Sequence, residues 1–318
     1  MTTGAGQPER ATPSPRKLAG IEALRVVACV SIVVFHADTS RWPNAVWGLF
    51  AFAAATVALA VRSAKRRGHG DFLRARARTL LLPWAAWWVA YAALVFAVTG
   101  GKTAEAMTPA SILSGPGRFL HLWFFPYAFV VSLLAGIACA RLTPRGERVA
   151  GIGAAVAACA GALAIAAWGA AESLTPPLWQ WLATAPAAVF GVTLASARRE
   201  AGPITPPLLT EIVALMLGAW FALRHTGLLT APPAYYTIAL AAVWAAWSWS
   251  KPAPRWLARA GSLTLGVFLV HPAVMLVYYK AAQTLGWTDD ALPRAAAVAF
   301  VSFALVWVLK RTPARALV

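Results

Sequence analysis

The chain has 318 residues, of which 60% are hydrophobic and 12% are charged, and its formal net charge is +17. Soluble domains are typically about 45–50% apolar and about 25% charged, so this composition excludes a water-soluble fold and indicates an integral membrane protein. The positive charge also raises nucleic-acid binding as an alternative, which the positions of the basic residues decide.

Apolar runs of about the length that spans a bilayer, roughly 20 residues, follow one another along the chain. We expect an all-α polytopic transmembrane helical bundle of ten helices that forms a single membrane domain over 18–310. The Thr-, Pro-, Gly- and Ser-rich residues 1–17 are expected to be a disordered cytoplasmic tail, and 311–318 a short cytoplasmic tail. The predicted helices cover 18–38, 45–62, 79–99, 119–140, 149–170, 178–196, 206–223, 232–249, 261–280 and 292–309.

Lysine and arginine alternate between successive loops. Of the 28 basic residues, 21 lie in the two terminal segments and in every second loop, whereas the intervening loops hold six. Cytoplasmic loops of membrane proteins carry such an excess, so both termini are predicted to face the cytoplasm and the first helix to run outward. The charge therefore indicates the orientation of a multi-pass protein in the cell membrane. The expected partner is the lipid bilayer, and no binding of nucleic acid is expected.

The first predicted helix contains three ionisable residues, Glu22, Arg25 and His36. Such residues are rare inside a membrane and usually face the bundle interior or a partner. Arg25 and His36 are eleven residues apart, a rotation of roughly 1,100° and a rise of about 16 Å, so they share one helix face at different depths. Glu22 lies one turn before Arg25 and can pair with it. The alternative is an ion pair at a helix end together with an interfacial histidine.

Four segments resemble, in order, the motifs of the acyltransferase-3 family of integral membrane O-acyltransferases. The stretch RVVACVSIVVFH, from Arg25 to His36, matches the Arg/Lys-x10-His signature, and an acidic residue at the position of Glu22 is usual. DFLRARARTLLLPWAAWW resembles the second motif, except that Thr79 stands where a further arginine is common. FLHLWFFPYAF resembles the His-x-Trp-Phe segment, and GSLTLGVFLVHP the closing motif.

The resemblance implies roles for the residues of the first helix. His36 is predicted to be the catalytic base that takes the proton of an acceptor hydroxyl, or to carry the acyl group covalently. Arg25 would orient His36 through Glu22 or a water molecule, or stabilise the thioester oxygen as negative charge develops.

The second motif is expected to bind the donor, acyl-coenzyme A. Arg74, Arg76 and Arg78 suit its 3′-phosphate and pyrophosphate, because guanidinium groups bind phosphate through two hydrogen bonds. The alternative is that this basic loop serves only as an orientation signal and attracts anionic lipid.

The third and fourth motifs supply the predicted acceptor-binding residues, His121, Trp123 and His271. An aromatic face at Trp123 can pack on a sugar. The alternatives are an interfacial aromatic belt at His121 and Trp123, and a packing histidine at His271.

The expected function is transfer of an acyl group, acetyl in the simplest case, to a hydroxyl of a glycan, a lipid-linked glycan or a secondary metabolite. No metal site is expected, because the three cysteines, Cys29, Cys139 and Cys159, have no metal-ligand spacing. The alternative class is a secondary transporter or flippase in which buried Glu, Arg and His residues, among them Glu211, form a proton relay.

Overall fold

The computed structural model describes most of the chain, and its regular elements are helices together with two isolated β-bridges. The described residues are 18–99, 109–116, 120–167, 174–197, 204–225, 234–249, 251–287 and 290–318. The helices are α1 (Ala19–Ala37), η1 (Pro43–Val46), α2 (Trp47–Ala64), α3 (His69–Arg76), η2 (Ala77–Leu81), α4 (Leu82–Thr99), α5 (Pro109–Ser114), η4 (Leu120–Trp123), α6 (Phe124–Cys139), α7 (Pro144–Ala167), α8 (Leu178–Ser196), α9 (Pro206–His225), α10 (Ala234–Ser248), α11 (Arg255–Leu285), α12 (Ala291–Leu309) and η6 (Pro313–Leu317).

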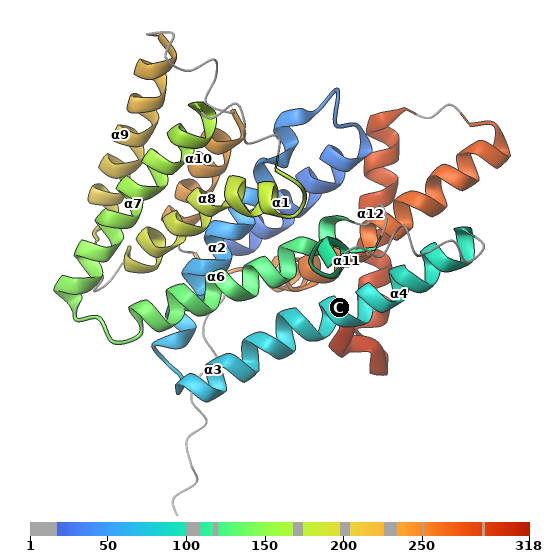
Figure 1. The fold of residues 1–318 in the computed structure, drawn as a ribbon, viewed down its shortest axis with the longest axis horizontal. Coiled ribbons are helices and arrows are strands. Elements are labelled where there is room, and N and C mark those ends of the chain that lie inside the picture. Colours follow the sequence, from blue (N-terminus) through green and yellow to red (C-terminus); the bar gives the residue numbers. More distant parts are fainter. Residues whose placement is uncertain are drawn as a thin grey trace, which may run out of the picture.

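The predicted all-α transmembrane bundle is confirmed. Within the described ranges, eight helices are long and apolar enough to cross a membrane, and α9 and α10 occupy the two remaining predicted positions. The helices form one bundle, with α7 and α9 at one end, α1 and α2 in the middle and α12 at the other end (Figure 1). The predicted tail 1–17 lies outside the described residues. The predicted cytoplasmic position of both termini stays a prediction.

One helix begins ten residues earlier than the apolar pattern indicated. The segment predicted over 79–99 is continuous with α3, so helix runs from His69 through η2 into α4. Alanine, leucine and arginine are strong helix formers, and only the charge of this segment kept it out of the apolar run. The η2 segment is a π-helical turn just before Pro83, which has no N–H to donate to the carbonyl of Thr79. The wider turn accommodates that missing bond.

Helix α2 lies at the centre of the bundle, where it packs against α1, α6, α8 and α10. Its approaches to α1 and α8 are made at glycines. A Cβ at Gly48 would collide with the carbonyl oxygen of Ala28 in α1, and a Cβ at Gly191 in α8 would collide with that of Ala54. Small residues allow membrane helices to pack backbone against backbone, which is the arrangement seen here.

Helix α1 runs alongside the first half of α11 and in the same direction. Glu22 contacts the position of Gly261, the thiol of Cys29 lies 3.5 Å from the carbonyl oxygen of Thr264, and the ring of His36 lies against that of His271. A seven-residue interval on α1 returns to nearly the same helix face, so Glu22, Cys29 and His36 form one stripe that faces α11. The parallel direction agrees with the predicted outward course of both helices.

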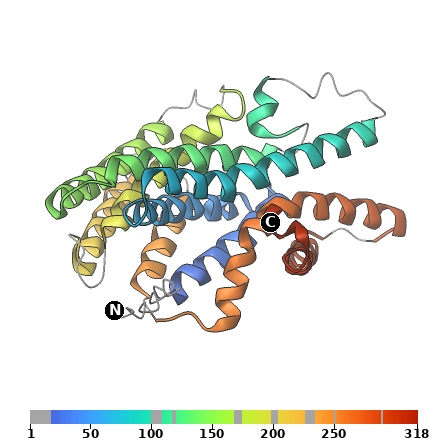
Figure 2. The same ribbon diagram turned by 90° about the horizontal axis from the view of Figure 1, so that it is seen from below.

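Helix α11 has 31 residues and contains Pro272 near its middle. The helix bends along its length, so its second half points away from α1 and toward α12 (Figure 2). Proline removes one backbone hydrogen bond from a helix and produces a kink. The bend places the backbone around Phe268 and Leu269 beside α4 and η4, where the candidate site lies.

Candidate active site

Three histidines from separate parts of the sequence meet in one cluster. His36 comes from the last turn of α1, His121 from η4 and His271 from the middle of α11. The ring centroids of His36 and His271 are 5.2 Å apart, and those of His121 and His271 are 5.6 Å apart. The rings of His121 and His271 are buried, whereas His36 is accessible. We call this group the histidine cluster, and His36 is its accessible member.

The bend in α11 determines the tautomer of His271. Because Pro272 has no N–H, the carbonyl of Phe268, four residues earlier, loses its usual helical partner. His271 Nδ1 lies 3.0 Å from that carbonyl oxygen and 3.2 Å from that of Val267. A nitrogen between two carbonyl oxygens must carry the proton, so Nε2 of His271 holds the lone pair.

Aromatic side chains surround the cluster. The hydroxyl of Tyr91, in α4, donates a hydrogen bond of 2.6 Å to the carbonyl oxygen of Leu269, in the same bend. The ring of His121 meets Tyr91 edge to face at 5.5 Å and lies 5.9 Å from Phe268. The sequence prediction did not include Tyr91, which stands in an apolar helix without a motif residue beside it. The signal that could have found it is its polar hydroxyl in an apolar helix, which needs a buried partner.

The Glu22–Arg25 pair lies at the other end of the α1–α11 contact. Arg25 Nη1 is 3.2 Å from Glu22 Oε2, and Glu22 is buried against α11 at Gly261. The helical rise puts Arg25 about 16 Å from His36, so Arg25 does not contact the histidine cluster. The predicted ion pair is confirmed. The roles predicted for Arg25, to orient His36 through Glu22 or a water molecule or to stabilise the thioester oxygen, stay predictions.

Replacing Gly261 by alanine is expected to lower stability and to disturb the Glu22–Arg25 pair. The new Cβ would collide with the carboxylate of Glu22, and overpacking of this kind costs about 1–3 kcal/mol. Thermal unfolding in detergent measures the effect. The matched control is Gly153→Ala in α7, where an added Cβ meets nothing within 4 Å. Equal melting temperatures for the two variants would contradict the close contact.

The three arginines of the second motif lie on two sides of their helix. Arg74 is exposed and lies 3.5 Å from Asp71, which is exposed as well, and Arg78 is also exposed. Arg76 is half-buried, with its guanidinium 5.6 Å above the ring of Phe72. At about 100° per residue, Arg76 points roughly opposite to Arg74 and Arg78. Arg76 is therefore the member of the motif that faces the protein interior.

Trp123 is placed apart from the histidines although it is only two residues after His121. It is buried, and its ring meets that of Tyr127 at 5.7 Å, which in turn meets Trp181 at 5.6 Å. In η4, a 3-10 helix of about three residues per turn, neighbouring side chains diverge, which separates the two. Trp123 thus belongs to an aromatic group next to the cluster, and its predicted contact with an acceptor stays a prediction.

Arg294, which belongs to none of the four motifs, is buried at the end of α1 that carries His36. Its Nη2 donates to the carbonyl oxygen of Ala37, the residue after His36, and its guanidinium lies 4.7 Å above the ring of Tyr279. A cation favours the C-terminal end of a helix, where backbone carbonyls have no helical partner. Arg294 therefore anchors the end of α1 that carries His36.

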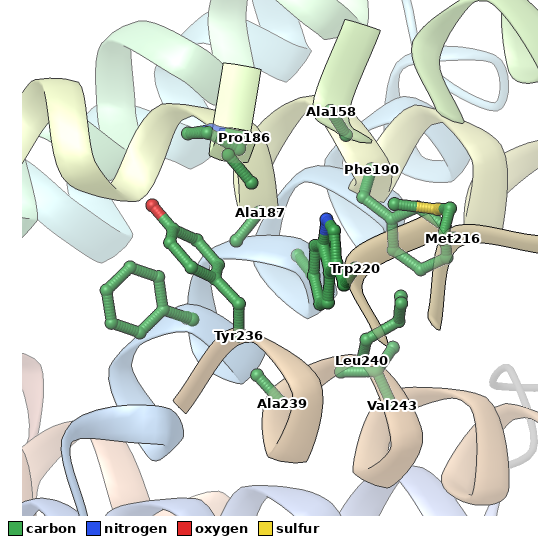
Figure 3. Close-up of a pocket in the computed structure, with 13 residues that line it drawn as sticks. Ala158, Pro186, Ala187, Phe190, Met216, Trp220, Tyr236, Ala239, Leu240 and Val243 are labelled. Atoms are coloured by element: carbon green, nitrogen blue, oxygen red, sulfur yellow. The ribbon is translucent and has the colours of Figure 1, made fainter. Parts of the chain in front are cut away.

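A hollow of about 30 Å³ lies among α2, α7, α8, α9 and α10. Its lining is apolar, and in Figure 3 the side chains of Phe190, Met216, Trp220 and Tyr236 point toward one another. The hydroxyl of Tyr236 donates to the backbone carbonyl of Ala183. The lining residues include no carboxylate and no histidine that can move a proton.

A helical bundle with three histidines clustered between its helices defines a polytopic membrane protein with ionisable side chains inside the bundle. The family model of the acyltransferase domain of acyltransferase-3 type matches residues 18–311. The chain belongs to this family, and it is a membrane acyltransferase. No curated protein and no solved structure matches the chain.

Proposed function

We propose that the protein is a membrane-embedded O-acyltransferase of the cell membrane. It takes an acyl group, acetyl in the simplest case, from cytoplasmic acyl-coenzyme A. It passes this group to a hydroxyl of an acceptor that lies outside the cytoplasm or in the membrane, and the favoured acceptor is a glycan.

The observation that carries the proposal is the histidine cluster. His36 is accessible and lies next to two buried histidines, so a reacting hydroxyl can reach one imidazole while the others stay away from solvent. Imidazole accepts and returns protons near neutral pH, as acyl transfer to a hydroxyl requires. This arrangement supports His36 as the general base.

The proposed reaction has two proton transfers, from the acceptor hydroxyl to His36 and from His36 to the coenzyme A thiolate. His36 accepts the hydroxyl proton as the acceptor oxygen attacks the thioester carbonyl carbon. The carbon–sulfur bond then breaks, the acyl group stays on the acceptor oxygen, and the coenzyme A thiolate takes the proton from His36. In the two-step variant the acyl group passes first to His36 and then to the acceptor.

On the donor side, Arg74, Arg76 and Arg78 are the proposed phosphate ligands. Arg25 and His36 share one face of α1 and mark the two depths of the proposed donor path. We propose that the pantetheine arm extends outward along this face. Arg25 then meets the donor rather than His36.

On the acceptor side, His121 and His271 are proposed to line the place where the hydroxyl approaches His36. Trp123 stays the predicted aromatic contact for a sugar, since an aromatic face can pack on one. In the structure its ring is buried against Phe124 and Tyr127.

The transport alternative receives less support. Family membership favours group transfer, and Glu211, one of the residues of the alternative relay, is exposed on α9, which packs against α7 and α10. The relay would also have to bridge the roughly 16 Å of helix between Arg25 and His36.

Replacing Arg76 by alanine is expected to weaken binding of acetyl-coenzyme A by about 10- to 100-fold, because a hydrogen bond to a charged group contributes about 1.5–3 kcal/mol. Isothermal titration of the purified protein in detergent measures the dissociation constant. Arg148→Ala, which removes an exposed arginine at the start of α7, is the matched control and should leave the constant unchanged. Equal weakening in both variants would mean that net charge, and not a phosphate site, attracts the donor.

The proposal itself is tested with radiolabelled acetyl-coenzyme A and 4-nitrophenyl glycosides as hydroxyl acceptors. The expected result is labelled ester on the glycoside together with an equal amount of free coenzyme A. Donor binding without ester on any hydroxyl acceptor would count against O-acyl transfer.

A further inference from the structure

His271 is a buried member of the histidine cluster, and only one of its two ring nitrogens, Nδ1, is hydrogen-bonded to the backbone. Its side chain is 0% exposed, and its Nε2 has no hydrogen-bond partner among the described residues. A buried polar atom left without a partner lowers stability, so such an atom in a folded protein points to a function. The ring centroid of His36 lies 5.2 Å from that of His271, and the ring centroid of His121 lies 5.6 Å from it.

We propose that His271 is a positioning residue for His36. Its unprotonated Nε2 accepts the ring N–H of His36, so that the lone pair of the other His36 nitrogen faces the acceptor hydroxyl. This inference rests on the proposed function and adds to it the group that orients the base.

The backbone supplies the reason that His271 can only accept. Pro272 leaves the Phe268 carbonyl without a helical partner, and His271 Nδ1 donates to it. With the proton held on Nδ1, Nε2 cannot act as a donor. A base that must keep one nitrogen free needs such a fixed acceptor on its other nitrogen. Pro272 thus fixes the tautomer of His271 that carries its proton on Nδ1.

His36 has no competing partner. Within the part of the chain that the structure describes, its side chain makes no hydrogen bond, and its ring contacts are with Phe35 and His271. The rings of His36 and His271 are tilted by 36° with their centroids 5.2 Å apart. The proposed hydrogen bond requires a rotation of the His36 side chain that brings one of its nitrogens to His271 Nε2. Arg25, at about 16 Å along the helix, cannot take this role.

During the reaction the His36–His271 hydrogen bond persists. When His36 accepts the hydroxyl proton, the other N–H of its imidazolium still donates to His271 Nε2. This hydrogen bond becomes stronger because its donor is then charged. The proton returns from His36 to the coenzyme A thiolate, and His271 keeps its own proton on Nδ1 throughout.

Two substitutions separate the nitrogens of His271. The amide nitrogen of asparagine falls near the position of Nδ1, so His271→Asn keeps a donor to the Phe268 carbonyl and removes the acceptor. The amide of glutamine reaches the position of Nε2, so His271→Gln restores an acceptor for His36. We expect the asparagine variant to lose about 10²-fold in kcat with unchanged acetyl-coenzyme A binding, and glutamine to recover part of that loss.

The decisive variant is Pro272→Ala combined with His271→Asn. Alanine returns an N–H to position 272, which can bond the Phe268 carbonyl in the absence of His271. If His271 served only to satisfy that carbonyl, the double variant would turn over like Pro272→Ala alone. We expect it to remain as slow as His271→Asn, measured with radiolabelled acetyl-coenzyme A and 4-nitrophenyl glycosides.

Recovery of the Pro272→Ala rate in the double variant, or wild-type kcat in His271→Asn, would overturn the proposal. Thermal unfolding checks that each variant is folded. The failure of the underlying function has a different signature: His36→Ala would then also retain turnover, or the wild-type protein would transfer nothing.

Discussion

Replacing His36 by alanine is expected to lower kcat for acyl transfer by about 10²–10⁴-fold, the range that general acid–base catalysis contributes. His36 is the accessible member of the histidine cluster, so its loss removes the group that takes the hydroxyl proton. Binding of acetyl-coenzyme A is expected to persist, because the proposed phosphate ligands lie on another helix. The measurement is the rate of free coenzyme A release beside the dissociation constant.

The matched control for this variant is His69→Ala, which removes an exposed histidine from the start of α3. It should leave both the rate and the dissociation constant unchanged. An equal loss of donor binding in His36→Ala and Arg76→Ala would contradict the division between a donor end and an acid–base end.

Replacing Arg25 by alanine is expected to destabilise the protein by about 3–5 kcal/mol, because the substitution leaves the carboxylate of Glu22 buried without its partner. Loss of turnover should accompany the loss of stability, since Arg25 is also proposed to meet the donor. The free energy change is followed by thermal or denaturant unfolding in detergent.

The double variant Glu22→Gln with Arg25→Gln separates stability from function. It removes both charges, so we expect most of the stability to return while turnover stays low. An Arg25→Ala variant as stable as the wild type would mean that Glu22 finds another partner or is neutral in the fold. Full turnover in the double variant would exclude both residues from the reaction.

The helices could be predicted because their lengths follow from the bilayer. A helix needs about 20 apolar residues to span it, and that rule located all ten segments. The largest errors from charge are at helix starts, at His69 in α3, Pro144 in α7 and Arg255 in α11. Arg255–Ala260 contains arginines that interrupt the apolar pattern, but those arginines do not interrupt the helix. Helical hydrogen bonding continues past the membrane boundary, and hydropathy does not measure it.

The contents of the site could be predicted only one helix at a time. The ion pair of Glu22 with Arg25 follows from their spacing, because residues three apart on a helix are neighbours. The meeting of His36, His121 and His271 depends on how three distant helices pack and on the bend at Pro272. No single segment contains that information. The order of the motifs indicated membership in one family but not which side chains touch.

Tyr91 and Arg294 lie next to the cluster and belong to none of the four motifs. Both act on backbone carbonyls: Tyr91 on that of Leu269 and Arg294 on that of Ala37. A backbone carbonyl has no signature in the sequence, so residues that serve one are found only when the fold is known.

The central claim, that the protein transfers an acyl group from coenzyme A through the His36 site, is tested most directly in proteoliposomes. Radiolabelled acetyl-coenzyme A is supplied to the predicted cytoplasmic face and a 4-nitrophenyl glycoside to the opposite face. The account predicts labelled ester on the glycoside side, dependent on His36 and matched by free coenzyme A on the donor side. Vesicles that bind no acetyl-coenzyme A and instead take up solute with protons would contradict it.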